Sequence, residues 1–174
     1  YQLSGVVPKV LGFLEELTNW YIRLNRRRFW ADGWTAEKRA AYGTLYEVLV
    51  GFTRVLAPML PFVTEAVYQN LERRRESDPE SIHLCRLPEA DAKKIDRELE
   101  AEMAILQRIV ALGRRCRAEA KIKTRQPLRR VRVFSQEATA RQALEQYCDL
   151  VTGELNVETI ELGHDDSAYV DVVV

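Results

Sequence analysis

A twelve-residue segment, residues 19–30, combines basic and aromatic side chains in a way that could bind RNA. It reads NWYIRLNRRRFW and contains no acidic residue. Guanidinium groups contact phosphates and stack on bases, and aromatic rings offer further stacking surfaces to unpaired nucleotides. The alternatives are a solvated basic helix end for the arginines and burial in a core for the tryptophans. The candidates are Arg23, Arg26 and Arg27 for phosphate contacts, and Trp30 and Trp34 for base stacking.

A second basic cluster ends the longest apolar stripe of the chain. Six basic residues lie within positions 114–125, more than a helix end needs to complement its dipole. Arg115 lies opposite Leu106 on the helical wheel, which predicts an exposed side chain. We expect this cluster to contact phosphates. Its members are Arg114, Arg115, Arg117, Lys121, Lys123 and Arg125.

The charges are strongly segregated along the chain although they sum to zero. Residues 103–132 hold ten basic residues and one acidic residue, a net charge of +9. Residues 137–166 hold eight acidic residues and one basic residue, a net charge of −7. This asymmetry predicts one face that meets a polyanion and another that does not. The excess of Arg over Lys, 20 to 6, suits bidentate phosphate contacts, and a GC-rich or thermophilic genome would explain it at least equally well.

Residue patterns that perform bond chemistry are missing from the sequence. The eight glycines are scattered and form no closely spaced loop for a nucleotide phosphate. No Ser or Cys has a plausible His base beside it, which disfavours a self-contained hydrolase. His83 and Cys85 lack the further partners that a zinc site requires. We therefore predict no catalytic residue, no metal site and no cofactor in this chain.

Five segments, taken in order, resemble the anticodon-binding domain of class I isoleucyl-tRNA synthetases. The resemblance runs from about Leu3 to Leu162, and Leu24 departs from it because the family commonly has a basic residue there. That departure weakens a phosphate role for this turn. The segments are residues 18–30 (TNWYIRLNRRRFW), 56–71 (LAPMLPF with E…YQNL), 81–84 (SIHL), 123–128 (KTRQPL) and 154–157 (ELNV).

The resemblance implies the tRNA-binding part of a larger cytoplasmic ligase that joins isoleucine to tRNA-Ile with ATP. It implies that the anticodon arm is the partner, and that catalytic and editing domains lie elsewhere in the same chain. ATP with magnesium, and a zinc ion, would belong to those other parts, and the active-site signatures of class I synthetases are absent here. The first residue is Tyr rather than Met, which fits a piece of a longer protein.

Two other interpretations stay open. The first is the equivalent domain of a valyl- or leucyl-tRNA synthetase, although residues 123–128 and 154–157 resemble the isoleucyl branch. The second is a helical protein-interaction module whose arginines form salt bridges within or between proteins. Salt-dependent binding to tRNA would separate an RNA-binding domain from that module.

The composition is that of a soluble globular domain, with 47% hydrophobic and 30% charged residues. No apolar run approaches the roughly 18 residues of a membrane span, so no membrane partner is expected. The three cysteines are isolated from one another, which suggests reduced thiols rather than a disulfide framework.

Hydrophobic periodicity and turn residues predict a mainly α fold, a helical bundle followed by a small α/β appendage. We place the bundle in residues 1–122 and the appendage in residues 123–174. Helices are expected near residues 8–28, 35–57, 61–74 and 91–120, with an extended connection at 75–92. Strands are expected at residues 128–134, 154–162 and 169–174, with a helix at 136–150 that makes the first two strands part of a βαβ-type unit.

Arg28 is expected to be structural rather than functional. On a regular helix it shares the apolar stripe of Val10, Leu17, Tyr21 and Leu24. A charge on a buried stripe must be paired, so we expect a buried partner for this guanidinium.

Overall fold

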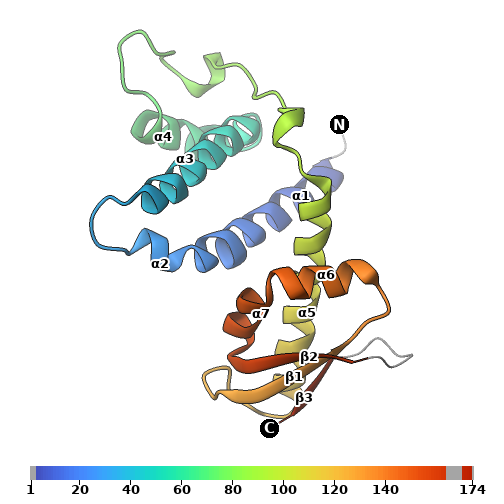
Figure 1. Ribbon diagram of the computed structural model, residues 1–174. Coiled ribbons are helices and arrows are strands. Elements are labelled where there is room, and N and C mark those ends of the chain that lie inside the picture. Colours follow the sequence, from blue (N-terminus) through green and yellow to red (C-terminus); the bar gives the residue numbers. More distant parts are fainter. Residues whose placement is uncertain (1–2, 164–169, 174) are drawn as a thin grey trace. The chain divides into compact units, whose positions relative to one another are not determined.

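The computed structural model describes residues 3–163 and 170–173. The chain forms two compact units, Tyr1–Ala90 and Asp91–Val174. Helices account for most of the described residues, and a three-stranded sheet lies in the second unit (Figure 1). The predicted mainly α class with a small α/β part is confirmed.

The first unit begins with a helix that is not regular throughout. Helix α1 (Leu3–Glu16) continues into the π-helical turn η1 (Leu17–Ile22), and a short helix, α2 (Arg26–Phe29), follows Asn25. The predicted helix start at Pro8 is wrong, because Pro8 lies inside α1. A proline lacks the N–H for one helical hydrogen bond, so its position within a helix could not be read from its type alone.

The π-helical turn explains why the prediction for Arg28 is wrong. Arg28 is exposed, and its Nη1 donates to Asn25 Oδ1 at 2.9 Å instead of to a buried partner. A π-turn inserts about one extra residue, which rotates everything after it by roughly 100° around the axis. Phe29 therefore takes the buried position that a regular helix would give to Arg28, and only 7% of Phe29 is exposed.

Helix α3 (Ala36–Leu56) packs against this first segment. Thr35 caps it by accepting a hydrogen bond from Lys38 N at 3.1 Å. The Tyr21 hydroxyl donates to Ala41 O at 3.1 Å. Two ring contacts complete the packing, with centroid distances of 4.6 Å for Phe13–Phe52 and 5.0 Å for Phe29–Tyr42.

Helix α4 (Pro61–Leu71) lies beside α3 and anchors the connection that follows it (Figure 1). Glu65 accepts hydrogen bonds from Ser81 Oγ at 2.8 Å and from Ile82 N at 3.0 Å. Hydrogen bonds from Gln69, Ser81 and Ile82 hold the pKa of Glu65 below its usual value. The connection predicted as extended therefore contains a fixed 3-10 turn, η2 (Ile82–Leu84).

The second unit starts with a 3-10 turn, η3 (Ala92–Lys94), and then the long helix α5 (Arg97–Glu119). The predicted start of this helix at Asp91 is wrong, because Asp91 caps η3 and Asp96 caps α5. Asp96 Oδ1 accepts from Leu99 N at 3.0 Å. Both residues are good N-caps, so the sequence did not distinguish between them.

The sheet has the strand order β2-β1-β3. Strands β1 (Leu128–Phe134) and β2 (Val157–Gly163) are parallel, and β3 (Val170–Val173) is antiparallel to β1. Helices α6 (Ala138–Gln146) and α7 (Cys148–Leu155) connect β1 to β2. The predicted βαβ-type unit is confirmed, and its single predicted helix is divided in two at Tyr147.

Helix α5 packs against α6, α7 and β3, which gather around it (Figure 1). The compact second unit therefore includes α5, whereas the hydrophobic periodicity placed this helix in a bundle that ends at residue 122. That domain boundary stays a prediction. Gly113 makes close packing on α7 feasible, since a Cβ there would lie 2.7 Å from Leu155 Cδ1.

Replacing Gly113 should therefore be costly. Gly113→Ala should destabilise the second unit by about 1–3 kcal/mol through overpacking on fully buried Leu155, despite the roughly 1 kcal/mol that Ala gains over Gly in a helix. Gly153→Ala in α7 meets nothing within 4 Å and should stabilise by about 0.5–1 kcal/mol. Urea denaturation of both variants measures the difference, and equal midpoints would contradict the packing of α5 on α7.

Tyr68 should make the first unit sensitive to alkali. Burial, together with a hydrogen bond to Cys85, raises the pKa of Tyr68 to about 12 from 10.0. As pH rises through this interval the unfolded chain loses the phenolic proton first, so stability falls with pH. Tyr68→Phe should cost roughly 1 kcal/mol at pH 7 through the lost hydrogen bond to Pro79 O, and should remove this part of the alkaline loss.

Urea denaturation at pH 7 to 11 measures this effect. Tyr46→Phe changes an exposed tyrosine and is the matched control, which should keep the alkaline slope of the parent chain. An unchanged slope in Tyr68→Phe would mean that another group causes the alkaline loss.

Candidate nucleic-acid interface

The first unit exposes the five candidate residues of the first basic segment and the turn after it. They are Arg23, Arg26, Arg27, Trp30 and Trp34. The three arginines are all exposed, and the two indoles are 68% and 67% exposed. The guanidinium carbon of Arg26 lies 5.3 Å from the centroid of the Trp30 ring, a cation–π distance. Burial in the core is thus excluded for both tryptophans, and the neighbouring Phe29 fills the core position instead.

The turn after α2 holds Trp34 in place by contacts that the sequence did not reveal. Gly33 adopts a φ of +67°, which favours glycine. Lys38 Nζ donates to Ala31 O at 2.8 Å and lies 5.5 Å from the centroid of the Trp34 ring. The Tyr42 ring is 5.7 Å away. Lys38 follows Trp34 by one helical turn, and that spacing is the signal that could have identified it.

The second unit presents a basic turn, residues 121–125, at the end of α5. The side chains of Lys121, Lys123 and Arg125 are exposed and make no hydrogen bond or ion pair with another described residue. Lys121 N donates to Ala118 O at 3.0 Å, and Ile122 N donates to Arg117 O at 2.8 Å. These two bonds form a Schellman motif, with Lys121 at its left-handed position at φ +55°.

The three arginines near the end of α5 that belong to the predicted basic cluster have different environments. Arg114 forms an ion pair with the largely buried Glu154 of α7. Arg115 is exposed, as predicted, and Glu119, which accepts from its Nε at 2.8 Å, raises the pKa of Arg115. Both remain at the surface but already have partners within the chain, so they are less available to a phosphate than the basic turn.

Arg117 is buried, and its assignment as a phosphate contact is wrong. Only 2% of it is exposed, and burial lowers the pKa of its guanidinium. Nη1 donates to the carbonyls of Lys123 at 3.2 Å and Gln126 at 3.0 Å. Nη2 donates to the carbonyls of Leu155 at 2.6 Å and Asn156 at 3.0 Å. Four carbonyl oxygens, rather than a carboxylate or a phosphate, balance this charge.

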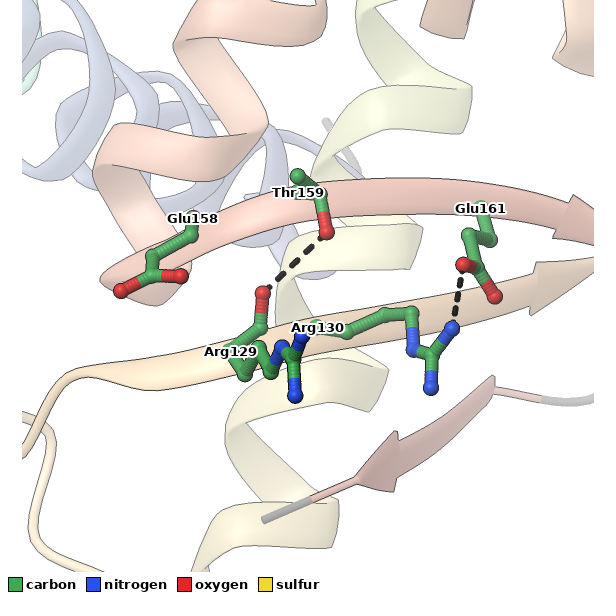
Figure 2. A pocket seen from close by; sticks show the side chains of 5 residues that line it. All are labelled: Arg129, Arg130, Glu158, Thr159 and Glu161. Atoms are coloured by element: carbon green, nitrogen blue, oxygen red, sulfur yellow. Dashed lines mark hydrogen bonds and ion pairs between the residues drawn. The ribbon is translucent and has the colours of Figure 1, made fainter.

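A polar hollow lies over β1 and β2, with a volume of about 320 Å³. Figure 2 shows Arg130 directed at Glu161, and the Thr159 hydroxyl donating to Arg129 O at 3.1 Å. Arg132 Nε also contacts Glu161, at 3.4 Å. Arg130 and Arg132 together hold the pKa of Glu161 below its usual value. Arg130 and Arg132 already share the Glu161 carboxylate, so the hollow is a weaker anion site than the basic turn.

The described residues offer neither a metal site nor a membrane span. Within residues 3–163 and 170–173, His, Cys, Asp and Glu side chains form no group of three that could hold a metal ion. In the same part of the chain, no helix combines the length and apolar character needed to cross a membrane.

Residues 1–133 match the family described as the anticodon-binding domain of tRNA ligase. The chain belongs to this family. It is also 44% identical over its whole length to an isoleucine–tRNA ligase of Chlamydia trachomatis. Over 98% of its length it is 42% identical to that of Clostridium acetobutylicum and 41% identical to that of Clostridium novyi. The chain spans 16% of the length of each of these relatives.

Two of the segments that carry the resemblance meet at one place in this anticodon-binding family member. Residues 123–128 (KTRQPL) supply two of the carbonyls that Arg117 contacts, and residues 154–157 (ELNV) supply the other two. Asn156 Nδ2 adds a hydrogen bond to Thr124 O at 3.2 Å. The two segments therefore form one structural contact although they are about thirty residues apart.

Lys121→Gly should stabilise the second unit while it removes a charge from the basic turn. Glycine adopts the left-handed conformation of this position without the steric cost of a side chain. We expect a gain of roughly 1 kcal/mol. Urea denaturation measures it, with Lys123→Gly as the control, because Lys123 is not left-handed and glycine there should be neutral or destabilising. A lower midpoint for Lys121→Gly would contradict the Schellman geometry.

Proposed function

We propose that this chain binds the anticodon arm of tRNA-Ile as part of a longer isoleucine–tRNA ligase. The observation that carries the proposal is the match to isoleucine–tRNA ligases at 41–44% identity over 98–100% of the chain. The parent enzyme would join isoleucine to its tRNA with ATP and magnesium in the cytoplasm. Its catalytic and editing domains would lie outside this chain, as would any zinc site.

The mechanism proposed for this part of the protein is binding and orientation rather than bond chemistry. Phosphate contacts supply most of the affinity for RNA, and stacking on exposed bases supplies further affinity. The basic turn provides three cations without a partner in the described part of the chain, and Arg23, Arg26 and Arg27 provide a second group. Trp30 and Trp34 provide exposed rings for unpaired anticodon-loop bases.

Arg114 and Arg115 have secondary roles in this proposal. Arg115 already donates to Glu119, so a phosphate would have to compete with this exposed ion pair for its guanidinium. The Arg114–Glu154 pair is more buried on the Glu154 side, so exchanging it for a phosphate takes an ion-pair partner from a desolvated carboxylate. We therefore expect the basic turn to contribute more to RNA affinity than the arginines of α5.

A tRNA titration in several salt concentrations tests the proposal. The logarithm of the affinity of the 174-residue chain for tRNA-Ile should fall linearly with the logarithm of salt concentration. The double variant Lys123→Ala, Arg125→Ala should bind more weakly and with a slope shallower by roughly two, about one for each phosphate that is no longer neutralised. Arg108→Ala, which removes an exposed cation about 20 Å away along α5, is the matched control and should leave the slope unchanged.

The other outcomes separate the alternatives. Salt-independent or absent tRNA binding would favour a protein-interaction module. Equal losses of affinity in the double variant and in Arg108→Ala would mean that general charge, and not the basic turn, holds the RNA. Tighter binding to tRNA-Val or tRNA-Leu than to tRNA-Ile would assign the chain to one of the sister enzymes.

A further inference from the structure

We infer that Arg117 is a positioning residue for the basic turn: it holds Lys123 and Arg125 in their binding arrangement without touching the RNA. This inference rests on the proposed function and extends it to a residue that is buried. It replaces the direct phosphate contact that the sequence suggested for Arg117.

The backbone of the turn is held from its inner side. Three carbonyls within residues 123–126 accept hydrogen bonds from buried or half-buried side chains. Arg117 donates to Lys123 O and Gln126 O, and Asn156 donates to Thr124 O. Gln126 N closes the turn on Lys123 O at 3.0 Å. With their carbonyls held inward, residues 123–126 have few conformations left, while the Lys123 and Arg125 side chains stay exposed.

The same guanidinium ties the turn to a rigid element. Its Nη2 donates to Leu155 O and Asn156 O at the C-terminal end of α7, where the helix dipole is negative. Asn156 itself is left-handed, at φ +50°, and its carbonyl also accepts from Leu128 N at 3.1 Å. The basic turn is therefore fixed to α5, α7 and the start of β1 through one buried side chain.

Fixing the turn raises affinity by lowering the cost of binding. Ordering the backbone of a mobile residue costs about 1–2 kcal/mol, and a turn that is ordered before binding avoids that cost. The phosphate contacts in the complex are the same in both cases. Replacing Arg117 should therefore reduce the affinity without reducing the number of counterions released, whereas replacing a residue that touches a phosphate reduces both.

Two variants loosen the turn in different ways. Arg117→Lys keeps the charge but lacks the planar fork that reaches four carbonyls at once. Asn156→Gly removes only the hydrogen bond to Thr124 O, and glycine suits the left-handed position that caps α7. The second variant keeps the inference testable if the first fails to fold. The matched control is again Arg108→Ala.

The experiment combines a tRNA-Ile titration at several salt concentrations with amide hydrogen exchange of the 174-residue chain. We expect Arg117→Lys to weaken binding roughly tenfold and Asn156→Gly roughly threefold, both with the salt slope of the parent chain. Exchange of the Ile122 and Gln126 amides should accelerate in both variants, while amides in the middle of α5 stay protected.

Three results would overturn the inference. Arg117→Gln, which removes the charge as well as the fork, should also keep the parent slope, and a slope shallower by about one in that variant would mean that Arg117 contacts a phosphate directly. Faster exchange with unchanged affinity in a folded variant would mean that order in the turn does not matter for RNA. Unchanged exchange in both variants would mean that these side chains do not order the turn. Failure of the proposed function looks different, because the parent chain itself would then show no salt-dependent binding.

Discussion

The second unit depends on one buried guanidinium, that of Arg117. A cation in a core is costly unless hydrogen bonds replace its water. Here four carbonyls do so for Nη1 and Nη2, two from the turn after α5 and two from the end of α7, while the buried Nε has no hydrogen-bond partner among the described residues. Because those carbonyls belong to segments that β1 and β2 extend directly, the same interaction sets where the two parallel strands begin. Arg117 thus links the end of α5, the basic turn and the end of α7 to the pairing of β1 with β2.

The first unit depends on a local change of helical period instead. The π-helical turn η1 rotates the helix after Ile22, so that Phe29 enters the core and Arg28 turns outward. The two adjacent aromatic residues, Phe29 and Trp30, then have different environments. Phe29 packs on Tyr42, while Trp30 remains exposed beside Arg26. A regular helix would have buried a charge, so the irregularity lowers the cost of placing several arginines in one short segment.

Much of the fold could be predicted because local rules decided it. The Thr35 cap, the strand at residues 128–134 and the βαβ-type connection all follow from nearby residues and periodicity. The errors share a different cause. Arg28 was misplaced because a π-turn has no reliable sequence signal, and Arg117 because its partners are backbone carbonyls up to 39 residues away. The sequence predicted the exposure of Arg115 but left open whether Trp30 and Trp34 are buried, and it did not reveal the contacts that hold these residues.

In the folded chain, part of the basic segment forms ion pairs with the acidic segment. Three residues of the basic segment contact two residues of the acidic segment, through Arg114–Glu154 and through Arg130 and Arg132 with Glu161. This pairing leaves the basic turn with cations that have no partner among the described residues. Since salt screens charges beyond about 10 Å, a polyanion responds to such a local excess and not to the net charge. A domain with zero net charge can therefore still present a local excess of positive charge to a polyanion, as at the turn that Arg117 holds.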